Sequence, residues 1–197
     1  EVEVPISIDS AKPKAVEAAL KLAPGRPLIN SVSGEEASLK EILPLAKEYS
    51  VPVVALCMDD SGIPADAEGR LAVAGKILER ATALGIGLED ILLDCLALTC
   101  SSDPLAPSVT LAAMRLARQR LGVNLTLGAS NVSFGLPDRD LLNGVFLGLA
   151  IAAGLNAPIV DPAKARPYIL AADLLLGKDE WAMRYISAYR QRQREQQ

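Results

Sequence analysis

VPVVALCMDDSGIPADAEGRLAVAGKILERATALGIGLEDILLDCL, residues 51–96, contains an apolar run of strand length, a longer segment of helical period and a second apolar run. Both runs are nearly continuous in apolar residues, as is typical of strands that are buried on both faces. Gly85 follows the helical segment and suits the position where a helix ends. The order strand, helix, strand predicts a βαβ unit within a parallel sheet.

The same alternation continues along the chain and predicts an α/β fold. We expect strands at residues 2–8, 27–32, 51–58, 91–96, 125–129 and 157–160. We expect helices at residues 12–22, 35–49, 66–84, 108–121, 140–153, 164–176 and 179–194, before a polar tail.

The number of strands limits the architecture. A closed TIM (β/α)₈ barrel needs eight strands and roughly 250 residues, whereas six βα units are visible here. We therefore expect residues 1–197 to form a single barrel domain that is N-terminally incomplete, with the first two units missing. An open sheet and a barrel completed by another chain are the alternatives.

The composition excludes several classes of function. With 197 residues, 50% of them hydrophobic, the chain can build one sizeable core. Its net charge of −4 offers no broad basic surface for nucleic acid or anionic lipid. No apolar run is long enough to span a membrane and no leader pattern precedes the first strand, so we expect no membrane partner and a cytoplasmic location.

The cysteines and the absence of histidine exclude several kinds of catalytic and metal site. The three cysteines, Cys57, Cys95 and Cys100, lack metal-ligand spacing and are interpreted as small buried side chains in a reducing compartment. The chain contains no histidine, which removes histidine metal sites, serine–histidine triads and imidazole bases. Any catalysis must depend on carboxylates, amides, hydroxyls or cations, and we expect no metal site.

Polar residues follow every predicted strand. In parallel α/β folds the carboxyl ends of the strands meet at one rim, where ligands bind. For any one strand, an ordinary loop start or helix cap is an equally good explanation. All six strands together favour a binding site formed by Asp9-Ser10, Asn30-Ser31, Asp59-Asp60, Asp94, Ser130-Asn131 and Asp161.

Asp94 and Asn30 are the strongest of these candidates. Asp94 is followed by four more apolar residues, so its carboxylate needs a hydrogen-bond donor to offset desolvation. Ser33 is the better cap for the helix that begins near Glu35, which leaves Asn30 free for a ligand. Carboxylates and amides at one rim suit a flat heterocycle that presents alternating donors and acceptors.

Two local strings resemble a known family. Residues 28–35, LINSVSGE, resemble the Ile-Asn-Ser strand of pterin-binding enzymes, and residues 128–137, GASNVSFGLP, resemble the signature strand and loop of methyltetrahydrofolate methyltransferases. Residues 7–10, 58–64, 93–94 and 171–190 give further matches in register. The resemblance covers essentially the whole chain. It is to methyltetrahydrofolate:corrinoid/iron-sulfur protein methyltransferases and to the folate domain of cobalamin-dependent methionine synthase.

This resemblance implies a fold, a reaction and a set of site residues. It implies a TIM barrel that binds the pterin at its mouth through Asp9, Asn30 and Asp94, with Asn131 beside the N5 atom that carries the methyl group. Further candidates for pterin binding are Ser130, Asp59 and Asp161. The implied reaction, in one-carbon metabolism, moves the methyl group of methyltetrahydrofolate to a cobalamin (corrinoid) carried by a partner protein, and the implied assembly is a homodimer.

The chain departs from the family pattern in two places. The first two strands of the family, one of which ends in an acidic pterin-binding residue, have no counterpart, and Cys95 replaces a proline that usually follows the aspartate. A pterin-binding or assembly subunit without activity of its own is therefore an alternative. A dihydropteroate synthase is a remote one, because residues 157–161 lack the arginine and histidine that its last strand carries.

Overall fold

The computed structural model describes residues 3–195 and contains one parallel sheet. Its six strands lie side by side in chain order, β1 to β6. The strands are β1 (Ser7–Asp9), β2 (Leu28–Ser33), β3 (Val53–Leu56), β4 (Ile91–Asp94), β5 (Asn124–Gly128) and β6 (Ala157–Ile159). All five pairings are parallel, as the βα alternation predicts.

A helix follows each strand, and one more helix ends the described chain. The helices are α1 (Pro13–Leu20), α2 (Glu36–Glu48), α3 (Ala67–Ala83), α4 (Ala106–Arg120), α5 (Arg139–Ala152), α6 (Pro162–Leu175) and α7 (Met183–Glu195). Short 3₁₀ turns at Leu88–Asp90, Ala129–Ser133 and Glu180–Ala182 precede β4, α5 and α7. None of the helices within residues 3–195 is long and apolar enough to cross a bilayer.

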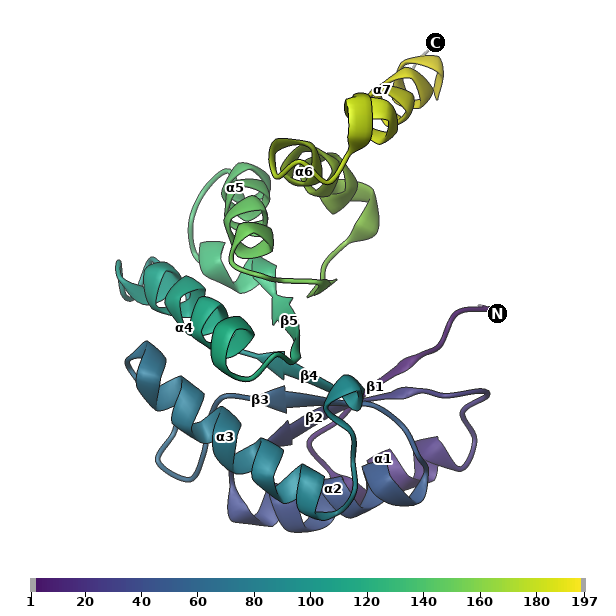
Figure 1. Ribbon diagram of the computed structural model, residues 1–197, viewed down its shortest axis with the longest axis vertical. Helices are drawn as coiled ribbons and strands as arrows, with labels where there is room; N and C mark the ends of the chain where they lie inside the picture. The colour runs from purple at the N-terminus through teal and green to yellow at the C-terminus, as the bar shows by residue number, and fades with distance from the viewer. Residues whose placement is uncertain (1–2, 196–197) are drawn as a thin grey trace.

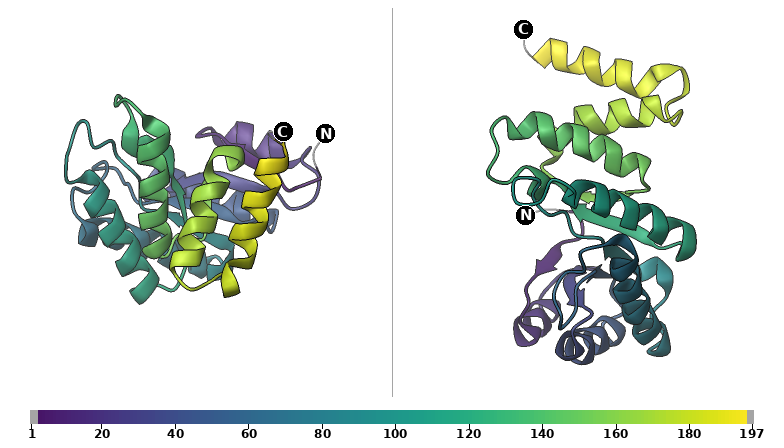
Figure 2. Two further views of the ribbon diagram at one scale, coloured as in Figure 1. Left: turned by 90° about the horizontal axis from the view of Figure 1, so that it is seen from above. Right: turned by 90° about the vertical axis from the view of Figure 1, so that its left-hand side faces the viewer.

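The sheet curls into part of a TIM barrel. In Figure 1, α1 to α3 lie below the sheet and α4 to α6 continue around its outer side. The right-hand view of Figure 2 shows α5, α6 and α7 stacked in chain order, away from α1 to α3. Within residues 3–195 the outer edges of β1 and β6 pair with no strand, so the described chain forms an open half-barrel.

Strand register explains which side chains face the core. Ile29, Val53 and Ile91 are partners across three neighbouring strands, and all three are fully buried. Successive side chains of a strand point to opposite faces, so these three lie on one face. Burial of such side chains stabilises the fold by about 1.5–3 kcal/mol each. The alternate positions therefore point to the other face.

The structure corrects the expected extent of the first strand and the expected cap of α2. The first strand, expected at residues 2–8, is limited to Ser7–Asp9, because this edge strand pairs only with β2, and Val4 is largely exposed; residue 2 lies outside the described range. Ser33 does not cap α2 as expected. It belongs to β2, whereas the Glu36 N–H at the start of α2 donates to Asp60 Oδ2 at 3.2 Å.

Candidate functional site at the carboxyl ends of the strands

Asp9 and Asn30 lie next to each other on the face of the sheet opposite that of Ile29. They are register partners, and Asn30 Nδ2 donates to Asp9 Oδ2 at 3.4 Å. Asp9 ends β1 as expected, whereas Asn30 lies within β2, which continues to Ser33. Asn30 pairs in turn with Val54, and Val54 with Leu92, so these residues share one face. The Asp9 side chain is exposed and that of Asn30 half-buried, which leaves both accessible to a ligand.

Asp94 belongs to the same face because it lies two residues beyond Leu92 on β4. Its side chain is buried, and its Oδ1 atom accepts the Leu96 N–H at 2.7 Å. Desolvation raises the pKa of Asp94 to about 6, although hydrogen bonds from the N–H groups of Leu96 and Gly128 and the nearby Arg70 charge act against this rise. Asp94 is therefore a buried acceptor whose charge state changes close to neutral pH.

Asn131 lies beside Gly128, the residue that donates to Asp94. A Cβ atom on Gly128 would stand 3.4 Å from Asn131 Nδ2, so the missing side chain leaves room for this amide. Asn131 is exposed and sits in the 3₁₀ turn directly after β5. The β5 end thus connects the buried carboxylate of Asp94 to an exposed amide.

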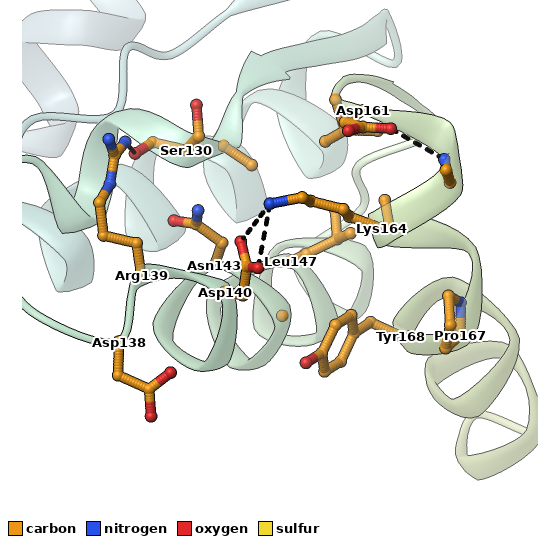
Figure 3. Close-up of a pocket in the computed structure, with 15 residues that line it drawn as sticks. Ser130, Asp138, Arg139, Asp140, Asn143, Leu147, Asp161, Lys164, Pro167 and Tyr168 are labelled. Atoms are coloured by element: carbon orange, nitrogen blue, oxygen red, sulfur yellow. Dashed lines mark hydrogen bonds and ion pairs between the residues drawn. The ribbon is translucent and has the colours of Figure 1, made fainter.

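Ser130 and Asp161 line a cavity of about 870 Å³ between α5 and α6 (Figure 3). Arg139 donates to the Ser130 carbonyl at 2.9 Å, and Lys164 forms an ion pair with Asp140 at 3.0 Å across the cavity. The Asp161 carboxylate caps α6 by accepting the Ala163 N–H at 3.0 Å. Asp161 is therefore already engaged locally, although its side chain borders open space.

Asp59 lies apart from Asp9, Asn30 and Asp94. Its Oδ1 atom accepts the Ser61 N–H at 2.9 Å, and its backbone pairs with Gly62 in a tight turn. It lines a separate cavity of about 400 Å³ beside α3, which Lys76 also borders. The structure thus places Asp9 beside Asn30 and Asn131 beside Gly128, which donates to Asp94, whereas Asp59 borders another cavity.

Arg70 is a residue of this region that the sequence analysis missed. It lies on α3, is only 1% exposed, and donates to the carbonyls of Cys95 and Leu96 directly after Asp94. A signal was present in the sequence. Arg70 shares one helical face with the buried Val73, Ala74 and Ile77, a position where an arginine requires buried acceptors.

The fold and the candidate site define a class of protein: a partial TIM barrel that carries carboxylates and amides at and near its strand ends. A family model described as "Pterin binding enzyme" matches residues 1–161. The chain belongs to the family of pterin-binding enzymes.

Two relatives show which members of this family the chain resembles. The chain is 31% identical to the methylcorrinoid:tetrahydrofolate methyltransferase of Eubacterium limosum over 96% of its own length and 72% of that protein. It is 34% identical to methionine synthase of Mycobacterium leprae over 83% of its length, which corresponds to 15% of that longer protein. The resemblance to tetrahydrofolate and corrinoid methyltransferases thus extends along nearly the whole chain.

A solved structure supports the fold independently. The dihydropteroate synthase of Yersinia pestis, solved with a pterine–sulfa conjugate, superposes with a TM-score of 0.70 over 89% of this chain and 70% of that one. The two sequences are 19% identical. At this identity the likeness establishes the partial TIM barrel and nothing about the reaction.

Proposed function

We propose that this chain binds the pterin ring of methyltetrahydrofolate and supports methyl transfer between the N5 atom of the folate and a corrinoid. The observation that carries the proposal is the strand-end cluster, in which the buried Asp94 and the exposed Asn131 meet at Gly128. The methyltransferase relatives agree with this choice of ligand.

Each cluster residue has a role that suits its chemistry. Ionised Asp94 can accept two parallel hydrogen bonds from the amino-pyrimidine edge of the pterin. The amide of Asn30 can donate and accept at once, and Asp9, already within reach of Asn30, supplies a further acceptor. Ser130, Asp59 and Asp161 are weaker candidates, because they border cavities between α5 and α6 or beside α3, away from the face of the sheet that Asp9, Asn30 and Asp94 share.

We assign to Asn131 the role of assisting the reaction itself, which its exposed amide after β5 supports. For the methyl group to leave, the bond between the methyl carbon and N5 breaks, its electron pair stays on N5, and N5 must be protonated. An amide oxygen can accept a hydrogen bond from protonated N5 without titrating. We expect this bond to strengthen toward the transition state, with solvent supplying the proton.

The corrinoid is a substrate in this scheme and is carried by a partner protein. Its low-valent cobalt supplies the electron pair for the new bond to the methyl carbon. The name of the Eubacterium limosum relative describes the opposite direction, from methylcorrinoid to tetrahydrofolate. The same residues serve both directions, because the forward and reverse reactions share one transition state.

Titration and turnover together test the proposal. Isothermal titration with methyltetrahydrofolate should show binding, and a spectroscopic assay should show methylation of cob(I)alamin and, in reverse, demethylation of methylcob(III)alamin by tetrahydrofolate. Binding without transfer in either direction would instead support a pterin-binding or assembly subunit. Absence of pterin binding would contradict the proposal.

We also infer that the chain forms a homodimer through its outer helices. Leu141, Val145 and Leu149 recur at four-residue intervals on α5 and are 53%, 56% and 48% exposed. A stripe of this kind is apolar surface that a second copy can bury. Light scattering should give the dimer mass, and Val145→Glu should give the monomer mass; a wild-type monomer would contradict the inference.

A further inference from the structure

The Cys95–Leu96 peptide group connects Asp94 to a buried arginine. Its N–H, which belongs to Leu96, donates to Asp94 Oδ1 at 2.7 Å. Its carbonyl, which belongs to Cys95, accepts from Arg70 Nη1 at 2.7 Å. The peptide group is thus polarised from both sides, and hydrogen bonds arranged in such a chain strengthen one another.

The backbone at this point needs support. Leu96 has a φ of 60°, in the left-handed region that is unfavourable for a residue other than glycine. Arg70 Nη1 also donates to the Leu96 carbonyl at 2.8 Å, so it holds the peptide groups on both sides of the Leu96 Cα atom. This conformation turns the Leu96 N–H back toward the Asp94 carboxylate.

Within residues 3–195, Arg70 forms no ion pair with a carboxylate. Its other hydrogen-bond partners there are the Pro64 carbonyl at 3.1 Å and the Thr110 hydroxyl at 3.0 Å. Burial lowers the pKa of Arg70, and the neighbouring acidic groups act in the opposite direction. A buried guanidinium held by carbonyls is costly, and its position beside a ligand-binding carboxylate suggests a role in the site.

We infer that Arg70 is a positioning residue for the pterin site, which acts on Asp94 through the Cys95–Leu96 peptide group and favours its ionised, acceptor form. The inference deepens the proposed function and rests on it only for the identity of the ligand. Arg70 itself lies on α3 and interacts with Asp94 through charge and through this peptide group.

The other groups that face Asp94 do not replace Arg70. From β5 the Gly128 N–H donates to Asp94, and this bond carries no net charge. Cys57, directly after β3, interacts with Asp94 through charge. A hydrogen bond with Cys95, together with burial, raises the pKa of Cys57 well above its usual range, so this thiol stays neutral. The charge of Asp103 acts on Arg70, whose pKa it raises. Arg70 is therefore the cation that favours ionised Asp94 among the groups that act on this carboxyl.

The titration of the Asp94 carboxyl group tests this inference without any ligand. In carbon-13 NMR, the wild-type midpoint is expected at about pH 6, and Arg70→Met should raise it by roughly one unit, since a nearby opposite charge typically shifts a carboxyl by one to three units. Methyltetrahydrofolate affinity at pH 7 should fall about two-fold from the added protonation of Asp94, a part that recovers at higher pH, and further from the lost support of the Leu96 backbone, a part that does not. Ile77→Ala, a buried change on the same helix, should lower stability but leave both the midpoint and the affinity as in the wild type.

Arg70→Lys keeps the inference testable if Arg70→Met does not fold. Lysine retains the charge but cannot hold two carbonyls in a fixed fork. The Asp94 midpoint should stay near that of the wild type, while the Leu96 amide resonance shifts and methyltetrahydrofolate affinity falls about three-fold or more. An unchanged midpoint in folded Arg70→Met, or an unchanged Leu96 resonance and affinity in Arg70→Lys, would overturn the inference. If no form of the protein binds the pterin, the proposed function fails while the carboxyl titration still decides the role of Arg70.

Discussion

Asp94→Asn should stabilise the ligand-free protein at neutral pH while it weakens pterin binding. In the folded protein, burial raises the pKa of Asp94 from 3.8 to about 6. Between these two values the folded state binds more protons than the unfolded state, so its stability falls as the pH rises. The contribution is complete below about pH 4 and lost once the pH exceeds about 6.

The magnitude follows from the size of the pKa change. A change of about two units, at 1.36 kcal/mol per unit, corresponds to a loss of about 3 kcal/mol on ionisation. Asparagine has a similar size, remains neutral and can accept the Leu96 N–H through its oxygen. Its NH₂ group cannot accept a second bond from Gly128, so we expect a net gain of about 1–3 kcal/mol at pH 7.

Urea unfolding at a series of pH values measures this effect. Between pH 4.5 and 7.5 the wild-type free energy of unfolding should fall relative to that of Asp94→Asn by about 2 kcal/mol, with most of the change below pH 6.5. Asp60→Asn, at an exposed carboxylate, provides the control. Parallel pH profiles for the wild type and Asp94→Asn would refute the argument, because Asp94 would then not titrate in this range. Methyltetrahydrofolate affinity should meanwhile fall by roughly ten- to a hundred-fold, the equivalent of one lost charge-assisted pair.

Three further changes test other parts of the structure. Asn131→Ala should lower the single-turnover methyl-transfer rate by about 10²-fold and pterin affinity by much less; a near-normal rate in the bound complex would make Asn131 a binding residue only. Gly144→Ala should destabilise by about 1–3 kcal/mol in thermal unfolding, because the new Cβ atom would collide with the Tyr168 ring. Gly148→Ala, on the same helix with open space around it, should be neutral or stabilise by up to about 1 kcal/mol, and equal effects at both glycines would contradict the packing argument. Asp66→Ala should cost about 1 kcal/mol, since the Asp66 carboxylate caps α3 by accepting the Gly69 N–H at 2.7 Å; an unchanged midpoint would show that the cap is dispensable.

The sequence by itself determined the order of the elements and the family of the protein. Strands that are buried on both faces need continuous apolar runs, and helices need an apolar stripe. Both patterns could therefore be recognised in the sequence without a structure. Helix ends marked by Gly85 and Gly177 were also predictable, and both glycines have positive φ angles. The resemblance carried by residues 28–35 and 128–137 was confirmed by the pterin-binding family match.

Strand length was less predictable, because it depends on partners that lie far away in sequence. The run expected at residues 91–96 ends as a strand at Asp94, since Leu96 adopts a left-handed conformation. Residues 3–6 are apolar enough for a strand but belong to none, since only β2 lies beside β1. Apolar composition indicates what can be buried, whereas pairing decides where a strand begins and ends.

Only the tertiary structure decided which polar residues lie near one another. Asp9 and Asn30 are register partners, Asp94 ends β4, and Asn131 follows β5, while their shared role in binding a pterin stays a prediction. Asp59 and Asp60 carried the same signal in sequence, yet one closes its own turn and the other caps α2. A carboxylate binds whichever donor the fold brings near it, and local sequence does not specify that donor. For the same reason the contacts of Arg70 were not predicted, since its acceptors at Cys95 and Leu96 lie 25 and 26 residues away along the chain.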